Sequence, residues 1–252
     1  MVVRRKHLAA SFLIGVAALG MFVGHSGTPD LENALRGPSP AHWLGADVLG
    51  RDVGRRLVQA AALSLVGSVA AWGIALVVGI AVGSFAAYTQ GTIAAQIVEE
   101  FIRVAYATPF LVVLVGLLGL LGPGILNAYL VVLLFAWAQP ARHASIMVGR
   151  LRHATHVRSV LALGYQPAQV VRFVLFPEVL PAVVAAALAV LPEILALDVA
   201  LSFFGLGAQP PRPTIGGLLV DGVTYASVAP WLLFFPLGTL SLICLAMRGL
   251  RS

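Results

Sequence analysis

Long apolar runs are the feature that most constrains this chain. A helix needs about 20 mainly apolar residues to cross the hydrocarbon core of a bilayer. Six runs approach or exceed this length, at residues 8–24, 60–88, 101–121, 125–138, 182–206 and 230–247. A soluble fold has no interior for so much apolar surface, because 60% of the 252 residues are hydrophobic and only 10% are charged. The sequence therefore predicts an all-α fold, a polytopic membrane bundle of six transmembrane helices.

The first run leaves two interpretations open. Three basic residues, Arg4, Arg5 and Lys6, precede it, which is typical both of a signal peptide and of a first membrane helix. The run is near the lower length limit for a membrane span, about 17 residues. It is also longer than most signal-peptide cores, about 7–15 residues. We therefore expect a membrane anchor.

Two polar segments divide the chain. Residues 25–56 contain Pro29, Pro38 and Pro40 and are expected to form an external loop. Residues 142–172 form the longest later polar segment and are rich in arginine. We expect residues 1–59 to provide an N-terminal membrane helix and external loop. Residues 60–252 would form a five-helix core with a cytoplasmic loop at about residues 142–181.

The basic residues flank the apolar runs and form no aromatic-interleaved patch, so we expect no nucleic-acid partner. Cytoplasmic termini and six spans place eleven basic residues inside: Arg4, Arg5, Lys6, Arg103, Arg142, Arg150, Arg152, Arg158, Arg172, Arg248 and Arg251. Five lie outside: Arg36, Arg51, Arg55, Arg56 and Arg212. Lys and Arg are enriched on the cytoplasmic side of membrane proteins. This asymmetry predicts a membrane protein with both termini in the cytoplasm.

No enzyme signature stands out. The chain lacks the GxSxG, HExxH and GxxxxGK[ST] patterns. Its single cysteine, Cys244, rules out a disulfide within the chain. His153 and His156 are three residues apart, but a solvated basic loop explains them better than a metal site. We expect no catalytic residue and no bound cofactor or metal.

Two acids fall within the fifth apolar run. Intramembrane acids are costly and therefore mark candidate functional sites. Glu193 and Asp198 are separated by about 140° around a helix, so one shared cation is not expected. Asp198 and Ser202 are four residues apart and share a face. The favoured alternative is that Asp198 bonds to polar groups of a neighbouring helix or lies near the outer interface of the membrane. Pro192 is expected to bend this helix, because its ring displaces the carbonyl four residues back and it has no N–H group.

The arginine-rich segment contains a candidate docking surface. An amphipathic stretch at residues 157–164 ends in Gly164, and a second short apolar piece follows, ending at Pro177 and Pro181. Two short helices separated by a glycine break would form such a surface. An ordinary interhelical loop is the alternative, and composition does not separate the two. In the second run, Gly79 and Gly83 form a GxxxG pattern that permits close helix packing.

The same segment resembles the EAA loop of binding-protein-dependent ABC importers, with Gly164, Pro177, Leu180 and Pro181 at the family's offsets. Three further segments resemble the C-type permease of the dipeptide, oligopeptide and nickel group. They are HWLGAD with LGRDV at residues 42–53, DVALSFFGLG at residues 198–207, and AQPPRP at residues 208–213.

The resemblance nominates two sets of residues. Glu193 is a further candidate because of its position within the membrane. The ATPase-coupling set is Arg158, Ser159, Leu161, Leu163, Gly164 and Gln169. The family-motif set is Asp47, Gly50, Arg51, Asp52, Asp198, Ser202, Gly205, Gly207, Pro210 and Pro211. The coupling loop is divergent, because the family's Glu is Arg158 here and its two alanines are Ser159 and Val160.

The resemblance implies a type I ABC importer permease of the bacterial plasma (inner) membrane that moves peptides or similar small solutes. It implies a second, B-type permease, two ATPases that use ATP and Mg, an external solute-binding protein, and lipid as surroundings. Nickel or metal-chelate import is an alternative within the family. A secondary transporter is the alternative of another class, although the halves show no clear repeat. An assembly subunit without a pathway also stays open.

The charge asymmetry generates a topology prediction. Reporter fusions after Arg36 and Arg212 are expected to report an external location, and fusions after Arg152 and Arg251 a cytoplasmic one. Paired phosphatase and fluorescent-protein reporters at each position provide internal controls. An external signal after Arg152 would overturn the predicted topology.

Overall fold

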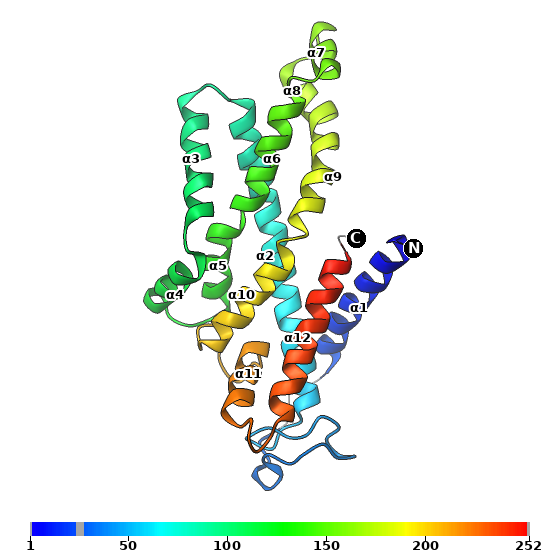
Figure 1. Cartoon of the computed structure of the whole chain (residues 1–252), viewed down its shortest axis with the longest axis vertical. Helices are drawn as coiled ribbons and strands as arrows, with labels where there is room; N and C mark the ends of the chain where they lie inside the picture. Colours follow the sequence, from blue (N-terminus) through cyan, green and yellow to red (C-terminus); the bar gives the residue numbers. More distant parts are fainter. Residues whose placement is uncertain (1, 24–27, 251–252) are drawn as a thin grey trace. The chain divides into compact units, whose positions relative to one another are not determined.

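Helices account for the regular structure of the chain. The computed structural model describes residues 2–23 and 28–250; the sequence-selected residues Gly24, His25 and Arg251 lie outside these ranges. Figure 1 labels the twelve α-helices of the described ranges: α1 Val2–Phe22, α2 Val53–Tyr88, α3 Ile93–Ala107, α4 Phe110–Leu121, α5 Ile125–Ala136, α6 Ala138–Leu151, α7 Thr155–Ala162, α8 Pro167–Val170, α9 Phe176–Ala187, α10 Leu191–Phe203, α11 Ile215–Thr224 and α12 Trp231–Gly249. The described ranges also contain a 3-10 turn at Leu31–Asn33 and a π-helical turn at Val171–Leu175.

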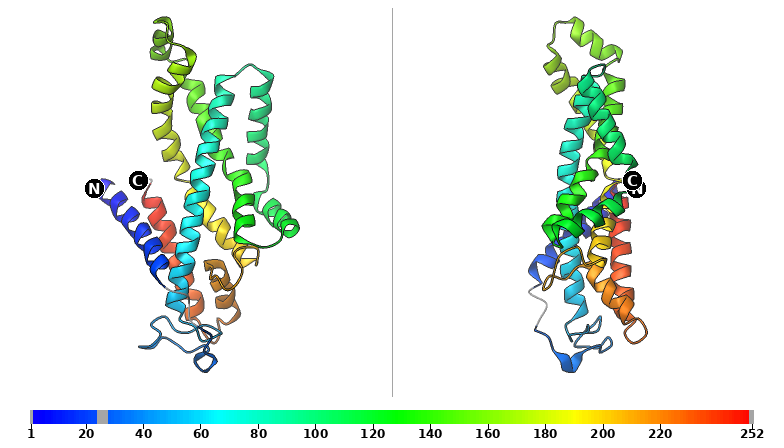
Figure 2. Two further views of the ribbon diagram at one scale, coloured as in Figure 1. Left: turned by 180° about the vertical axis from the view of Figure 1, so that it is seen from behind. Right: turned by 90° about the vertical axis from the view of Figure 1, so that its left-hand side faces the viewer.

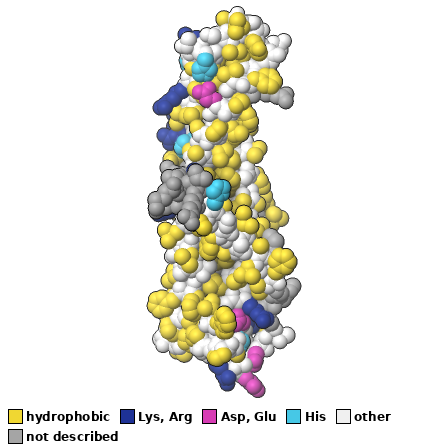
Figure 3. Space-filling view, turned by 90° about the vertical axis from the view of Figure 1, so that its right-hand side faces the viewer, with side chains coloured by type: hydrophobic (Ala, Val, Ile, Leu, Met, Phe, Trp, Pro, Cys, Tyr) yellow, Lys and Arg dark blue, Asp and Glu magenta, His cyan; other side chains and the backbone are white. Residues whose placement is uncertain are grey.

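Several helices have the length and apolarity of membrane spans. Three qualify alone: Val53–Tyr88, Ile125–Leu151 and Trp231–Gly249. Two broken pairs, α3 with α4 and α9 with α10, raise the number to 5 if each pair is one span. Hydrophobic side chains make up much of the surface seen in Figure 3. The predicted all-α fold with several membrane spans is confirmed, and the count of six spans stays a prediction.

The third and fourth predicted runs differ from the observed helices. The third was expected to be continuous over residues 101–121, but it is interrupted between α3 and α4, where Thr108 is extended (φ −70°, ψ 135°). The cause is Pro109, because a proline disfavours helical dihedrals in the residue before it. The fourth continues through α6 to Leu151. Arg142 and Arg150 therefore lie on a helix, where a loop was expected.

The fifth run is also interrupted. Helix α9 ends at Ala187 and α10 begins at Leu191. A bend at Pro192 was expected, but the observed break precedes the proline. Proline is well tolerated in the first turn of a helix, so Pro192 lies in the first turn of α10, which begins at Leu191.

The chain forms two compact units that interleave along the sequence. Unit 1 comprises residues 1–70, 111–132 and 191–252, and unit 2 comprises residues 71–110 and 133–190. The predicted division into an anchor with its loop (residues 1–59) and a five-helix core (residues 60–252) describes how the chain lies in the membrane, and it stays a prediction. Within unit 1, α1 lies beside α12, with the start of α1 and the end of α12 at the same end (Figure 2).

The core of unit 2 joins α2, α6 and α9. Ile80, Ala144, Val148 and Val183 are among its buried members. The Trp72 Nε1 group also donates a hydrogen bond of 2.8 Å to the carbonyl of Ala187. These contacts hold the second half of α2 against two other helices of the unit.

The predicted close approach at Gly79 and Gly83 is confirmed. A Cβ atom at Gly79 would lie 2.7 Å from the Trp137 carbonyl oxygen and 2.8 Å from the Ala141 nitrogen. A Cβ atom at Gly83 would overlap the Ala141 carbonyl. The missing side chains let the backbones of α2 and α6 touch.

This contact generates a stability prediction. Gly83→Ala is expected to destabilise the protein by about 1–3 kcal/mol, because the added methyl group collides with backbone that cannot rotate away. Gly73→Ala is the control, since Gly73 lies in the same helix and has no atom within 4 Å of its would-be Cβ. The thermal unfolding temperature of the purified chain in detergent measures the stability of both variants. Equal temperatures for the two variants would contradict the packing argument.

Candidate functional site

The predicted coupling segment folds as two short helices around a glycine. Helix α7 ends at Ala162, and Gly164 has a φ of 90° with its N–H bonded to the Leu161 carbonyl at 3.0 Å. Glycine adopts this left-handed conformation without steric cost and so commonly ends helices. Helix α8 follows, where the Gln169 Oε1 atom accepts a hydrogen bond of 2.9 Å from the Gln166 N–H. The predicted glycine break is confirmed.

One face of α7 is anchored. Val157 is 2% exposed and forms a small core with Val170 and Leu175. The Ser159 hydroxyl donates to the Thr155 carbonyl at 3.0 Å within the helix. The His156 Nε2 atom lies 3.2 Å from a Glu178 carboxylate oxygen, which links α7 to α9. His156 and His153 thus have different neighbours, since Arg152 donates to His153.

The other face of the segment is exposed. Leu161 is 42% exposed, Leu163 77% and Tyr165 51%. Arg158 and Gln169 are exposed beside them. Exposed apolar side chains flanked by polar ones are typical of a protein-docking surface. We call the surface formed by Arg158, Leu161, Leu163 and Tyr165 the coupling surface.

The family-motif residues before α2 form a buried electrostatic cluster in unit 1. Asp47 is fully buried and accepts hydrogen bonds from the N–H groups of Leu49 (2.8 Å) and Arg51 (2.9 Å). The Arg51 Nε and the Arg56 guanidinium also donate to this carboxylate. Two cations and two backbone donors compensate the buried charge, which would otherwise be very costly.

Neighbouring residues hold this cluster in place. Asp52 accepts the Arg55 N–H at 2.7 Å, as an N-cap residue does at the start of a helix. The other carboxylate oxygen of Asp52 lies 3.1 Å from His42 Nδ1. Gly50 has a φ of 72°, and a Cβ atom there would overlap the Asp30 backbone. These residues therefore shape the loop itself.

The cluster also reaches the C-terminal part of unit 1. Asp221, on α11, lies 3.8 Å from Arg56. Burial raises the pKa of the Asp221 carboxyl group, and the nearby Arg56 guanidinium opposes this rise. The Trp231 Nε1 group donates to the Ala46 carbonyl at 3.3 Å. The loop that precedes α2 is thereby attached to α11 and α12.

The two acids of α10 have different surroundings. Glu193 is exposed in the first turn, whereas Asp198 is 7% exposed and Ser202 6%. The Asp198 carboxylate lies next to the hydroxyl groups of Ser64 and Tyr129, which come from α2 and α5. Asp198 and Ser202 share a buried face, as their spacing predicts. The surroundings favour the alternative in which Asp198 bonds to polar groups of neighbouring helices.

The glycines and prolines after α10 form a helix-terminating turn. Gly205 has a φ of 76°; its N–H bonds to the Ser202 carbonyl at 3.1 Å, and the Leu206 N–H bonds to the Leu201 carbonyl at 2.9 Å. This pair of bonds is a Schellman motif. Gly207 packs against Ser202, where a Cβ atom would collide. Pro210 and Pro211 are exposed beyond the turn and joined by a cis peptide bond.

Comparison with known proteins identifies the family. Residues 79–250 match the family described as binding-protein-dependent transport system inner membrane component. The chain belongs to this family. It is therefore a multi-pass inner-membrane permease subunit of an ABC transporter and not itself an enzyme. This membership decides against the secondary-transporter alternative.

Sequence alignments with named relatives extend over most of this permease. It is 32% identical to the dipeptide transport system permease protein DppC of Bacillus subtilis, over 95% of this chain and 75% of the relative. It is 28% identical to the glutathione transport system permease protein GsiD of Pectobacterium atrosepticum, over 98% of this chain and 86% of the relative. The oligopeptide transport system permease protein OppC of Bacillus subtilis is 28% identical, over 88% of this chain and 72% of the relative.

A solved structure shares the fold. The permease resembles a chain of the inward-facing MetNI methionine ABC transporter with a TM-score of 0.56 and 24% identity, over 77% of this chain and 93% of that chain. This likeness bears on the fold alone.

Some residues of these clusters were not nominated as site residues from the sequence. Arg56 and Asp221 complete the Asp47 cluster, although both stand at positions that match the family's motifs. Tyr129 and Ser64 adjoin Asp198. For Arg56 a signal exists, because a charge four residues into an apolar helix needs a partner. Tyr129 and Ser64 give no comparable signal, since single hydroxyl groups are common in membrane helices.

The buried cluster generates a prediction about the external loop. Asp47→Ala is expected to destabilise the loop by about 3–5 kcal/mol, because it leaves the buried Arg56 with only the more distant Asp221 carboxylate. Asp52→Asn is the control: its side chain is 24% exposed, asparagine still caps the helix, and a partly exposed pair contributes about 0–1 kcal/mol. Limited proteolysis of residues 28–52 and thermal unfolding measure the effect. Equal protection of both variants would contradict the assignment.

Proposed function

We propose that this permease is one of two membrane subunits of an ATP-driven importer for peptides. Its pathway would lie between it and a homologous B-type permease. An external solute-binding protein would deliver the peptide, and two ATPases, which use ATP and Mg, would dock on the cytoplasmic side. The permease itself would bind no cofactor, and lipid would surround it.

The coupling surface is the observation that carries the proposal. Helix α7 is short, anchored through Val157, and exposes Leu161 and Leu163 beside the left-handed Gly164. A rigid apolar projection of this kind suits a groove on a partner protein. Arg158 is exposed next to it, where the family's usual residue is acidic. We infer that the matching ATPase position has changed with it, toward an acidic residue.

Helix lengths support the proposed topology. The long helices and broken pairs provide up to 5 spans, and α1, with 21 residues, would provide the sixth. With six spans, both termini would be cytoplasmic and the Asp47 cluster external. In this arrangement residues 1–59 would form the anchor and external loop, and residues 60–252 the five-helix core.

The names of the relatives support a peptide solute. The relatives are named as permeases for dipeptides, oligopeptides and glutathione. Each of these solutes contains peptide bonds and charged ends. A metal chelate stays the alternative within the same family. Reconstitution with the second permease, the ATPases and the binding protein tests the proposal. ATP-dependent uptake of a labelled dipeptide supports it, whereas uptake or ATP hydrolysis by this chain alone contradicts it.

Gly164→Val is expected to uncouple ATP hydrolysis from transport. A β-branched residue at a φ of 90° strains the backbone by about 1–3 kcal/mol, which would displace the coupling surface. We expect peptide uptake to fall about tenfold or more, with membrane insertion unchanged. Gly149→Val is the control, because Gly149 lies in α6 with open space around it and without a positive φ. Normal uptake per ATP in the Gly164 variant would contradict the coupling role.

A further inference from the structure

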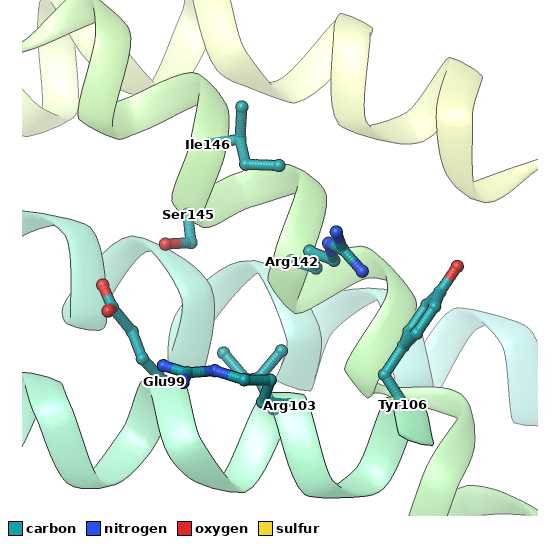
Figure 4. A pocket seen from close by; sticks show the side chains of 7 residues that line it. Glu99, Arg103, Tyr106, Arg142, Ser145 and Ile146 are labelled. Atoms are coloured by element: carbon teal, nitrogen blue, oxygen red, sulfur yellow. The ribbon is translucent and has the colours of Figure 1, made fainter. Parts of the chain in front are cut away.

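A pocket of about 360 Å³ lies between α3 and α6 in unit 2 (Figure 4). Small-ligand sites in proteins have volumes of about 300–1,000 Å³. The residues used in the argument are Glu99, Ile102, Arg103 and Tyr106 of α3, with Arg142 and Ser145 of α6. Ile102 is 5% exposed and is the buried apolar member of the pocket. We call this the α3–α6 pocket.

Charges of opposite sign occupy the two ends of this pocket. In Figure 4, the Glu99 carboxylate and the Ser145 hydroxyl lie at one end, Arg142 and Tyr106 lie at the other, and the Arg103 side chain extends from the middle toward the Glu99 side. The Arg142 Cζ atom lies 4.9 Å from the centre of the Tyr106 ring. The pocket therefore has an acidic end and a basic, aromatic end.

The charges at both ends are available to a ligand. The Arg103 Nη1 atom is 3.1 Å from Glu100, in an exposed pair that does not involve Glu99. Across the described ranges, Glu99 and Arg142 form no ion pair with another residue. Stacking on Tyr106 restricts the Arg142 guanidinium while leaving its N–H groups free to donate.

We propose that the α3–α6 pocket binds the two charged ends of a short zwitterionic peptide. Glu99, with Ser145, receives the terminal ammonium group. Arg142, held by Tyr106, binds the terminal carboxylate through the paired N–H geometry that guanidinium offers to carboxylates. This inference rests on the proposed function, in which the solute is a peptide. A purely anionic ligand, such as a lipid phosphate, would bind Arg142 but leave the Glu99 carboxylate without a ligand partner.

The test measures binding of three probes to the complete transporter in nanodiscs, without the solute-binding protein. The probes are alanyl-phenylalanine, its N-acetyl derivative and its C-terminal amide. The wild-type complex is expected to bind the free dipeptide about tenfold more tightly than either blocked form. Glu99→Gln should abolish discrimination against the N-acetyl form and retain discrimination against the amide.

Arg142→Gln should give the converse pattern, which a misfolded variant cannot produce. Glu100→Gln is the matched control, because Glu100 neighbours Glu99 in sequence but does not line the pocket. Uniform losses for all three probes in both variants, or unchanged binding in both, overturn the assignment. Displacement of the dipeptide by phosphatidylglycerol, with no discrimination between the probes, overturns it in favour of a lipid phosphate.

A parallel uptake assay with the binding protein separates the two proposals. If the wild-type complex imports dipeptide and the pocket variants bind all probes as the wild type does, the pocket assignment fails and the proposed function stands. If the wild-type complex imports none of the peptides, both fail.

Discussion

In a membrane, every backbone polar group must be satisfied within the protein, and this constraint governs both interrupted helix pairs. At the α3–α4 break, the Thr108 N–H and hydroxyl both donate to the Val104 carbonyl, at 3.1 and 2.7 Å. At the α9–α10 break, the N–H groups of Leu188, Ala189 and Val190 donate to preceding carbonyls at 2.9–3.1 Å. The chain can therefore interrupt its helices without leaving these donors unpaired.

Buried acids follow the same requirement in two ways. Asp47 is neutralised by Arg51 and Arg56 and by backbone donors, so the acid and its cations together fix the loop that precedes α2. Asp198 has hydroxyl neighbours and no cation paired with it within the described part of the chain. One cluster is thus a charge-compensated clamp, whereas the other is a polar contact between helices. Two acids within family motifs have different physical roles.

Features encoded by local sequence were predictable, and features that depend on distant segments were not. The glycine break at Gly164 and the close approach at Gly83 follow from single residues with no side chain. The α3–α4 break was missed, although Pro109 signals it through its effect on the preceding residue. The α3–α6 pocket was not predictable, because Glu99 and Arg142 come from helices that meet only after folding.

Unit 2 links the coupling surface mechanically to that pocket. At the base of α7, the Arg152 Nη1 group donates to the Ala87 carbonyl of α2 at 2.7 Å, and His156 contacts Glu178 of α9. A force applied to α7 therefore reaches α2, α6 and α9 through short contacts. Helix α6 contributes Arg142 to the pocket, and Gly83 lets α2 touch its backbone. Because close-packed interiors transmit strain, a force on α7 can alter the spacing of α3 and α6, and with it the distance between Glu99 and Arg142.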